Sequence, residues 1–253
     1  MRFIRSDSFR IAIGLAVGQS VVFLATPLLT RLFDPTQFGA LTLFVTIATI
    51  AGVLGTLRLE LLIPRAADED VSSLAVTSMV AVTVTALIVG AAALAVFENG
   101  VEASLLLAAV VVAMGAGAVL LQLAARAQQY RQLAMSKAAL GFVQVSVQAA
   151  VGLARISSSG LVWGIVAGYW ASVLIQYRGL RKHPVVQSMR VFRRDWPSVA
   201  RILKQAVPLI LASVANVIST SALVLATSAY AGAEVTGQLG VAQRLALIPA
   251  GLT

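Results

Sequence analysis

The 253-residue sequence contains no cysteine, one histidine and few charged residues, which make up 11% of the chain. Without cysteine, the chain can form no disulfide, thiolate nucleophile or cysteine-ligated metal site. An ordinary soluble domain carries about 25% charged residues, so this chain lacks the charge that solvates a globular surface. Disorder is excluded as well, because disordered segments combine low hydrophobicity with high net charge. These absences leave a membrane protein with several spans.

Long apolar runs fill most of the chain, which is 59% apolar with a mean hydropathy of +0.91. A membrane-spanning helix needs about 20 mostly apolar residues. The complete runs cover residues 9–30, 38–61, 74–97, 103–125, 138–156, 160–177 and 206–230, and an eighth begins near residue 236. Transmembrane strands would instead alternate in polarity over segments of about ten residues. We therefore predict an all-α polytopic membrane protein with about 7–8 transmembrane helices.

The basic residues are distributed unevenly along the chain, which carries 19 Lys and Arg against 10 Asp and Glu. If the N-terminus is cytoplasmic, sixteen of the 19 lie in segments on the cytoplasmic side. Arg31 and Arg155 fall on the other side, and Arg244 lies within the eighth run. Because an excess of Lys and Arg marks cytoplasmic loops, this distribution predicts a cytoplasmic N-terminus. It explains the net charge of +9 without a nucleic-acid partner.

The longest connection between apolar runs covers residues 178–205 and holds eight Lys and Arg. We predict that it is a basic amphipathic cytoplasmic linker whose cations lie near anionic lipid headgroups. It separates an N-terminal six-helix lobe (1–177) from the start of a C-terminal lobe (206–253), and we interpret the end of the sequence inside an apolar run as a sign of truncation. Gly39 and Gly237 each follow a short external loop at the start of a helix, which indicates two copies of one structural unit.

Two segments near the N-terminus resemble a known family. The order LLTRLFDPTQFGALTLF and then LRLELLIPRAADEDVSSLAVTS is similar to the first two spans and first cytoplasmic loop of bacterial polysaccharide biosynthesis proteins. These are O-antigen-type flippases of lipid-linked oligosaccharides, in the multidrug/oligosaccharidyl-lipid/polysaccharide exporter superfamily. The segments RAQQYRQLAMSKAALGFVQVSVQAAVG and SGLVWGIVAGYW resemble the family's segments around the fifth and sixth spans.

The resemblance implies two six-helix lobes, arranged as an inverted V around a central cavity. In that family the cavity carries an undecaprenyl-pyrophosphate-linked oligosaccharide across the bacterial inner membrane. The implied partners are this lipid-linked oligosaccharide, membrane lipids and a polysaccharide polymerase complex. A lipid II flippase and a cation-coupled drug exporter of the same superfamily remain alternatives, although an exporter predicts embedded carboxylates and the first six runs offer only Glu60. A non-catalytic membrane subunit of a polysaccharide pathway is the alternative from another class.

The sequence contains no recognisable catalytic or metal-binding constellation. Its single His183 lies in the basic loop, and the only acidic cluster is DED at 68–70. We interpret that cluster as preceding the third run, with Ser72 or Ser73 as the N-cap. P-loop, dinucleotide and nucleophile-elbow motifs are also absent. We therefore expect no enzyme activity and no cofactor, and we expect transport to be driven by a gradient.

Polar residues within the apolar runs are candidate substrate contacts, because an ionisable group in hydrocarbon is costly unless it faces protein or a wet cavity. Arg58 and Glu60 interrupt the second run, and a guanidinium suits a pyrophosphate group. Alternatively, Arg58 reaches the cytoplasmic interface and Glu60 pairs with an arginine. The full set of candidates is Arg58, Arg31, Gln19, Gln122, Arg126, Gln144, Gln148 and Asn216.

Two pairs among these candidates share a helical face at four-residue spacing, namely Gln122 with Arg126 and Gln144 with Gln148. Their amides suit sugar hydroxyls, and they suit hydrogen bonds between neighbouring helices equally well. The sequence alone does not separate these two roles.

Glycines at four-residue intervals mark two further helix faces, one with Gly160, Gly164 and Gly168 and one with Gly14 and Gly18. Small residues at this spacing let helices approach closely. We predict that these faces pack within the N-terminal lobe, with dimerisation as the alternative.

Overall fold

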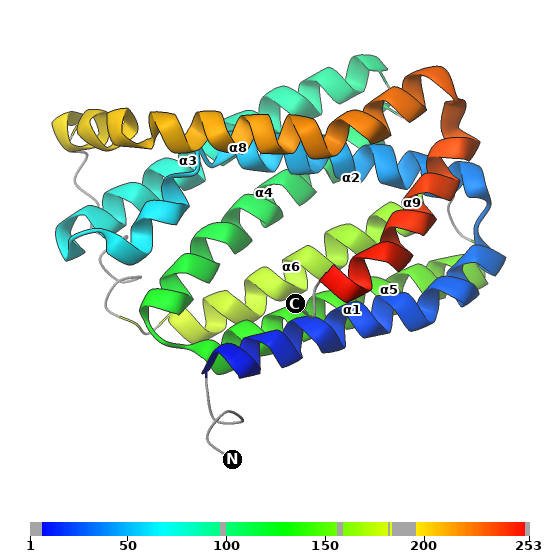
Figure 1. Ribbon diagram of the computed structural model, residues 1–253, viewed down its shortest axis with the longest axis horizontal. Coiled ribbons are helices and arrows are strands. Elements are labelled where there is room, and N and C mark those ends of the chain that lie inside the picture. Colours follow the sequence, from blue (N-terminus) through cyan, green and yellow to red (C-terminus); the bar gives the residue numbers. More distant parts are fainter. Residues whose placement is uncertain (1–6, 97–99, 156–158, 182, 184–195, 251–253) are drawn as a thin grey trace. The chain divides into compact units, whose positions relative to one another are not determined.

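The computed structural model describes residues 7–96, 100–155, 159–181, 183 and 196–250, and the regular elements of these residues are all helices (Figure 1). The α-helices are α1 (Asp7–Leu32), α2 (Pro35–Gly55), α3 (Asp68–Val96), α4 (Gly100–Arg126), α5 (Tyr130–Ala154), α6 (Gly160–Leu180), α8 (Trp196–Tyr230) and α9 (Gly232–Ala250), with a 3₁₀ helix η2 (Leu59–Arg65). Seven of them are long and apolar enough to cross a membrane. The predicted all-α polytopic class is confirmed.

Two predicted helix boundaries are wrong. Helix α2 ends at Gly55 rather than at residue 61, because the backbone at residues 57 and 58 takes positive φ angles that no right-handed helix accommodates. Helix α3 begins at Asp68, so the acidic cluster forms its first turn, and Ser72 and Ser73 lie inside the helix instead of capping it. The three carboxylates still lie at the positive end of the helix dipole, where negative charge is stabilising.

Helix α8 begins inside the predicted linker, and α9 begins slightly earlier than the predicted eighth run. Pro197 lies in the first turn of α8, where the amide hydrogen that proline lacks has no helical partner. The part of α8 that qualifies as a membrane span is Ala206–Tyr230, as the sequence predicted. Residues 184–195 of the predicted linker lie outside the described residues, and the predicted domain boundaries stay a prediction.

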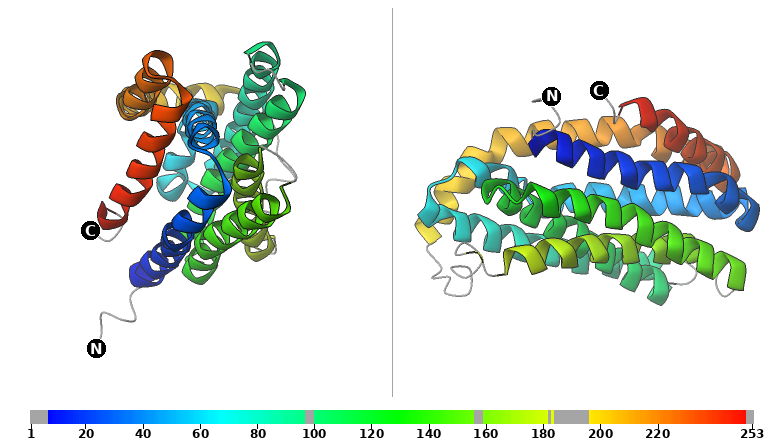
Figure 2. Two further views of the ribbon diagram at one scale, coloured as in Figure 1. Left: turned by 90° about the vertical axis from the view of Figure 1, so that its right-hand side faces the viewer. Right: turned by 90° about the horizontal axis from the view of Figure 1, so that it is seen from below.

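The chain divides into two compact units, each of which is described separately. Unit 1 comprises Met1–Ile47, Tyr130–Ser172 and Thr220–Thr253, and unit 2 comprises Ala48–Gln129 and Val173–Ser219. In unit 1, α1 packs along α5, and the two helices lie side by side in each of the three views in Figures 1 and 2. In unit 2, α3 packs along α4, and η2 contacts both of them.

Glycines bring the helices of unit 1 into close contact. A Cβ atom added to Gly14 or Gly18 of α1 would overlap the backbone of Ala134 or Lys137 on α5. A Cβ added to Gly141 of α5 would likewise overlap the backbone of Gly18. The glycine face of α1 therefore packs within the chain, as predicted.

The core of unit 2 is built around Val82 of α3, which is fully buried. A Cβ added to Gly55, the last residue of α2, would lie 3.1 Å from Val82 Cγ2, and one added to Gly115 of α4 would overlap the same side chain. These two glycines therefore let α2 and α4 approach α3 closely. The packing of Gly55 on Val82 therefore fixes the end of α2, just before the turn that carries Arg58.

Candidate functional site

The segment after α2 makes a tight turn through two left-handed residues. Leu57 and Arg58 have φ angles of 51° and 53°, and the Leu59 amide donates a hydrogen bond of 3.2 Å to the Thr56 carbonyl. A left-handed conformation costs about 1–2 kcal/mol for a residue with a Cβ atom. The turn is therefore strained, and the surrounding packing has to hold it. Arg58 and Glu60 thus lie beyond α2, which corrects the prediction that they interrupt a span.

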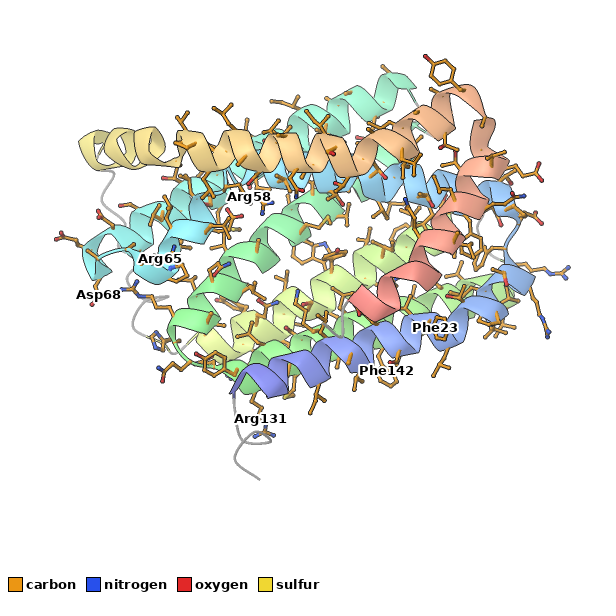
Figure 3. The ribbon with its side chains drawn as sticks, viewed as in Figure 1. Phe23, Arg58, Arg65, Asp68, Arg131 and Phe142 are labelled. Carbon is orange, nitrogen blue, oxygen red and sulfur yellow. The ribbon has the colours of Figure 1, made fainter. Side chains whose placement is uncertain are left out.

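Helix η2 anchors this turn to the core of unit 2. Leu59 and Ile63 lie on η2 and are both fully buried. Between them in the sequence, Glu60 is only 2% exposed, whereas the Arg58 side chain keeps 25% of its surface exposed. Figure 3 shows Arg58, Arg65 and Asp68 following one another along this connection. The turn thus holds a partly accessible guanidinium beside a buried carboxylate.

Arg58 and Glu60 form a loose ion pair. Arg58 Nη1 lies 3.7 Å from Glu60 Oε1, which is within ion-pair range but too long for a hydrogen bond. Among the described residues, Arg58 Nε and Glu60 Oε2 are buried without a hydrogen-bond partner. Burial raises the pKa of the Glu60 carboxyl, and hydrogen bonds and the charge of Arg58 offset this only in part. Because this ion pair is loose and the Arg58 side chain is partly exposed, the guanidinium is suited to bind an external anion.

Arg126, in the last turn of α4, binds the C-terminal end of η2. Its Nη1 donates hydrogen bonds of 2.7 Å to the carbonyl oxygens of Ile63 and Ala66, and its Nη2 donates to the Asp68 carboxylate. The sequence pattern placed Arg126 and Gln122 on one helical face and left open whether that face contacts sugar hydroxyls or a neighbouring helix. The structure directs the Arg126 guanidinium to the backbone of the η2–α3 connection, while Gln122 is half-buried.

Gln144 and Gln148 of α5 lie against the glycine face of α6. Gln148 is fully buried, and its Nε2 donates a 2.8 Å hydrogen bond to the Leu161 carbonyl oxygen. A Cβ added to Gly164 would overlap the Gln148 side chain, and one added to Gly168 would lie 3.0 Å from Gln144 Cβ. Of the two roles that the sequence left open, the structure gives Gln148 that of a bridge between helices. The predicted packing of the α6 glycines within the chain is confirmed.

Three remaining candidates lie on exposed helix surfaces. Gln19 and Arg31 of α1 and Asn216 of α8 are all exposed. Their role as substrate contacts stays a prediction.

In unit 1, the first turns of α2 and α9 meet through a reciprocal backbone contact. A Cβ added to Gly39 would overlap the Ala233 carbonyl oxygen, and one added to Gly237 would overlap the Pro35 carbonyl oxygen. In both helices the carbonyl belongs to the residue four positions before the glycine. This symmetry supports the inference that α2 and α9 are equivalent helices in two copies of one unit.

The two helix starts are formed by different local means. At α2, the Asp34 amide donates a 2.9 Å hydrogen bond to Gln37 Oε1, which makes half of a capping box around Pro35. At α9, Gly232 turns the chain with a φ of 82°, which glycine adopts readily.

A cavity of about 350 Å³ opens beside this crossing. Its lining is mostly apolar and is shared by the end of α1 and the starts of α2 and α9. The lining residues are Thr30, Phe33, Pro35, Phe38, Gly237, Gln238, Val241 and Ala242. Sequence reasoning did not find this cavity, because residues far apart in the chain form it.

The described residues contain no group of three or more His, Asp or Glu side chains that could hold a metal ion. No curated protein and no solved structure matches the chain. A family model described as polysaccharide biosynthesis protein matches residues 5–253. This chain, with its seven candidate membrane spans, therefore belongs to the polysaccharide biosynthesis protein family.

Proposed function

We propose that this protein moves a lipid-linked oligosaccharide across the bacterial inner membrane for surface polysaccharide synthesis. The family supports a role in polysaccharide biosynthesis, and the apolar helices support a membrane location. The lipid carrier in our proposal is undecaprenyl pyrophosphate, whose charged group has to be stabilised by fixed cations on its way through a region of low dielectric constant.

The observation that carries the proposal is the environment of Arg58. Its guanidinium is partly exposed and has only a loose ion pair with Glu60. Arginine binds phosphate oxygens in a bidentate fork, so Arg58 can exchange this pair for stronger bonds to pyrophosphate. Arg126 differs from Arg58 because its hydrogen bonds go to the protein backbone and to Asp68.

We further propose that the N-terminus is cytoplasmic, in line with the distribution of Lys and Arg. Arg58 then lies at the cytoplasmic side, where the substrate is loaded. In this account the protein performs no covalent chemistry and needs no cofactor. Its partners are the lipid-linked oligosaccharide, membrane lipids and a polysaccharide polymerase complex.

Genetic complementation tests the proposal. Expression of the protein in a strain that lacks its oligosaccharide flippase should restore surface polysaccharide, and Arg58→Ala should abolish most of that restoration at unchanged protein level. Arg65→Ala is the matched control, because Arg65 is an exposed arginine at the other end of η2. If Arg65→Ala loses as much surface polysaccharide as Arg58→Ala, or if Arg58→Ala loses none, Arg58 has no specific role in transport.

A further inference from the structure

The connection between α2 and α3 is held at three places. Gly55 packs on Val82 at its beginning, Leu59 and Ile63 are buried in its middle, and Arg126 binds its last part. The strained residues Leu57 and Arg58 lie between the first two of these places.

The strained turn persists only while its ends are fixed. Residues 57 and 58 would relax to right-handed angles if η2 shifted, and that relaxation would swing the Arg58 side chain away from Glu60. Buried Leu59 and Ile63 resist such a shift through apolar contacts, which are not directional. The two hydrogen bonds from Arg126 Nη1 to the Ile63 and Ala66 carbonyls do fix direction and register.

We propose that Arg126 is a positioning residue for Arg58, which it orients through η2 without touching the substrate itself. The inference rests on the proposed function of Arg58. Three hydrogen bonds occupy the Arg126 guanidinium, and their acceptors come from both ends of the η2–α3 link. A lysine cannot reproduce this pattern, because its ammonium is a point charge without the planar fork.

Binding of undecaprenyl pyrophosphate to the 253-residue chain in lipid nanodiscs tests the inference. The variants are Arg58→Ala, Arg126→Ala and the double variant, with Arg126→Lys in case the alanine variant does not fold. Arg131→Ala is the control for net charge, because Arg131 is exposed on α5, the next helix along the chain. Thermal melting of each variant reports stability separately from affinity.

Arg58→Ala should weaken binding about tenfold, as expected for the loss of one charge-assisted contact. Arg126→Ala should weaken binding to a similar extent, because Arg126 acts through the position of Arg58. The double variant should bind within about twofold of Arg58→Ala, because residues that act through one another are not additive. Arg126→Lys should also lose affinity, and Arg131→Ala should bind like the wild type.

Two results would overturn the inference while leaving the role of Arg58 intact. One is a further tenfold loss in the double variant, which would mean that Arg126 contacts the ligand independently. The other is an unchanged affinity after Arg126→Ala or Arg126→Lys. If Arg58→Ala itself leaves binding unchanged, the proposed function of Arg58 fails instead.

Discussion

Gly237 packs so closely on Pro35 that a Cβ atom at Gly237 would overlap the Pro35 carbonyl oxygen, and Gly39 has the same relationship to Ala233. Two helices whose starts are 197 residues apart (Pro35 and Gly232) therefore meet through matching positions. Such approaches allow weak Cα–H···O contacts between helix backbones. The fold of unit 1 thus depends on glycine at both positions.

Alanine at either position should destabilise the protein. Gly39→Ala and Gly237→Ala should each lower the free energy of unfolding by about 1–3 kcal/mol, because the added methyl group forces the helices apart. The double variant should lose less than the sum, since both changes act on one contact.

Thermal melting in detergent measures these effects, with Gly52→Ala as the control. Gly52 lies in α2, and a Cβ added there would be 3.6 Å from Met114 Cβ, an ordinary contact distance. That change should be neutral or stabilising, by up to about 1 kcal/mol. Equal destabilisation by all three alanines would mean that the α2–α9 crossing is not formed.

Gln148 should matter for stability rather than for substrate affinity. Gln148→Ala removes the buried hydrogen bond to Leu161 and leaves space against α6, which should cost about 1–3 kcal/mol. Gln19→Ala, at an exposed position of α1, should stay within about 0.5 kcal/mol of the wild type. If Gln148→Ala keeps normal stability but no longer binds undecaprenyl pyrophosphate, Gln148 contacts the substrate instead.

The stability of the protein should depend on pH through Glu60. Burial raises the pKa of Glu60 above its ordinary value of 4.5, so the folded state binds this proton more tightly than the unfolded state does. The resulting stability is fully present below pH 4.5 and is lost as the pH rises through the raised folded pKa.

Glu60→Gln should remove the part of the stability loss with rising pH that Glu60 causes, because the amide does not titrate. Melting temperatures between about pH 4 and 8 measure it, with exposed Glu69→Gln as the control. A pH profile that Glu60→Gln leaves unaltered would show that the folded-state pKa of Glu60 is not raised.

Cysteine labelling tests the predicted orientation, and the native chain gives no background because it lacks cysteine. Val101→Cys should react in intact cells with an impermeant maleimide, and Glu69→Cys should react only after lysis. Both positions are exposed, so differences in burial do not confuse the result. The opposite pattern would place the N-terminus outside.

Sequence periodicity and length were sufficient to predict the helical class and the seven spans, because an apolar run of about 20 residues has few other stable structures in a membrane. The end of α2 was not predictable in this way. Residues 56–63 are mostly apolar, and neither Leu57 nor Arg58 marks a left-handed turn. That turn depends on contacts of η2 with α3, the next helix, and with α4, which begins only at Gly100.

The candidate site was predictable in its residue types and less so in their roles. Arg58 was identified because a charge beside an apolar run is unusual. Arg126 satisfied the same criterion, but its acceptors lie about 60 residues earlier in the chain, and no local pattern reveals them. Gln148 likewise matched two roles until the position of Leu161 was known.

Translocation in proteoliposomes tests the central claim most directly. The measurement follows the appearance of an undecaprenyl-pyrophosphate-linked oligosaccharide in the opposite leaflet, where a lectin in the surrounding buffer detects the sugar. Liposomes with the wild-type protein or Arg65→Ala should transfer the lipid faster than protein-free liposomes, and Arg58→Ala should slow the transfer about tenfold. Transfer by the wild-type protein at the protein-free rate, or equal rates for wild type and Arg58→Ala, would contradict the account.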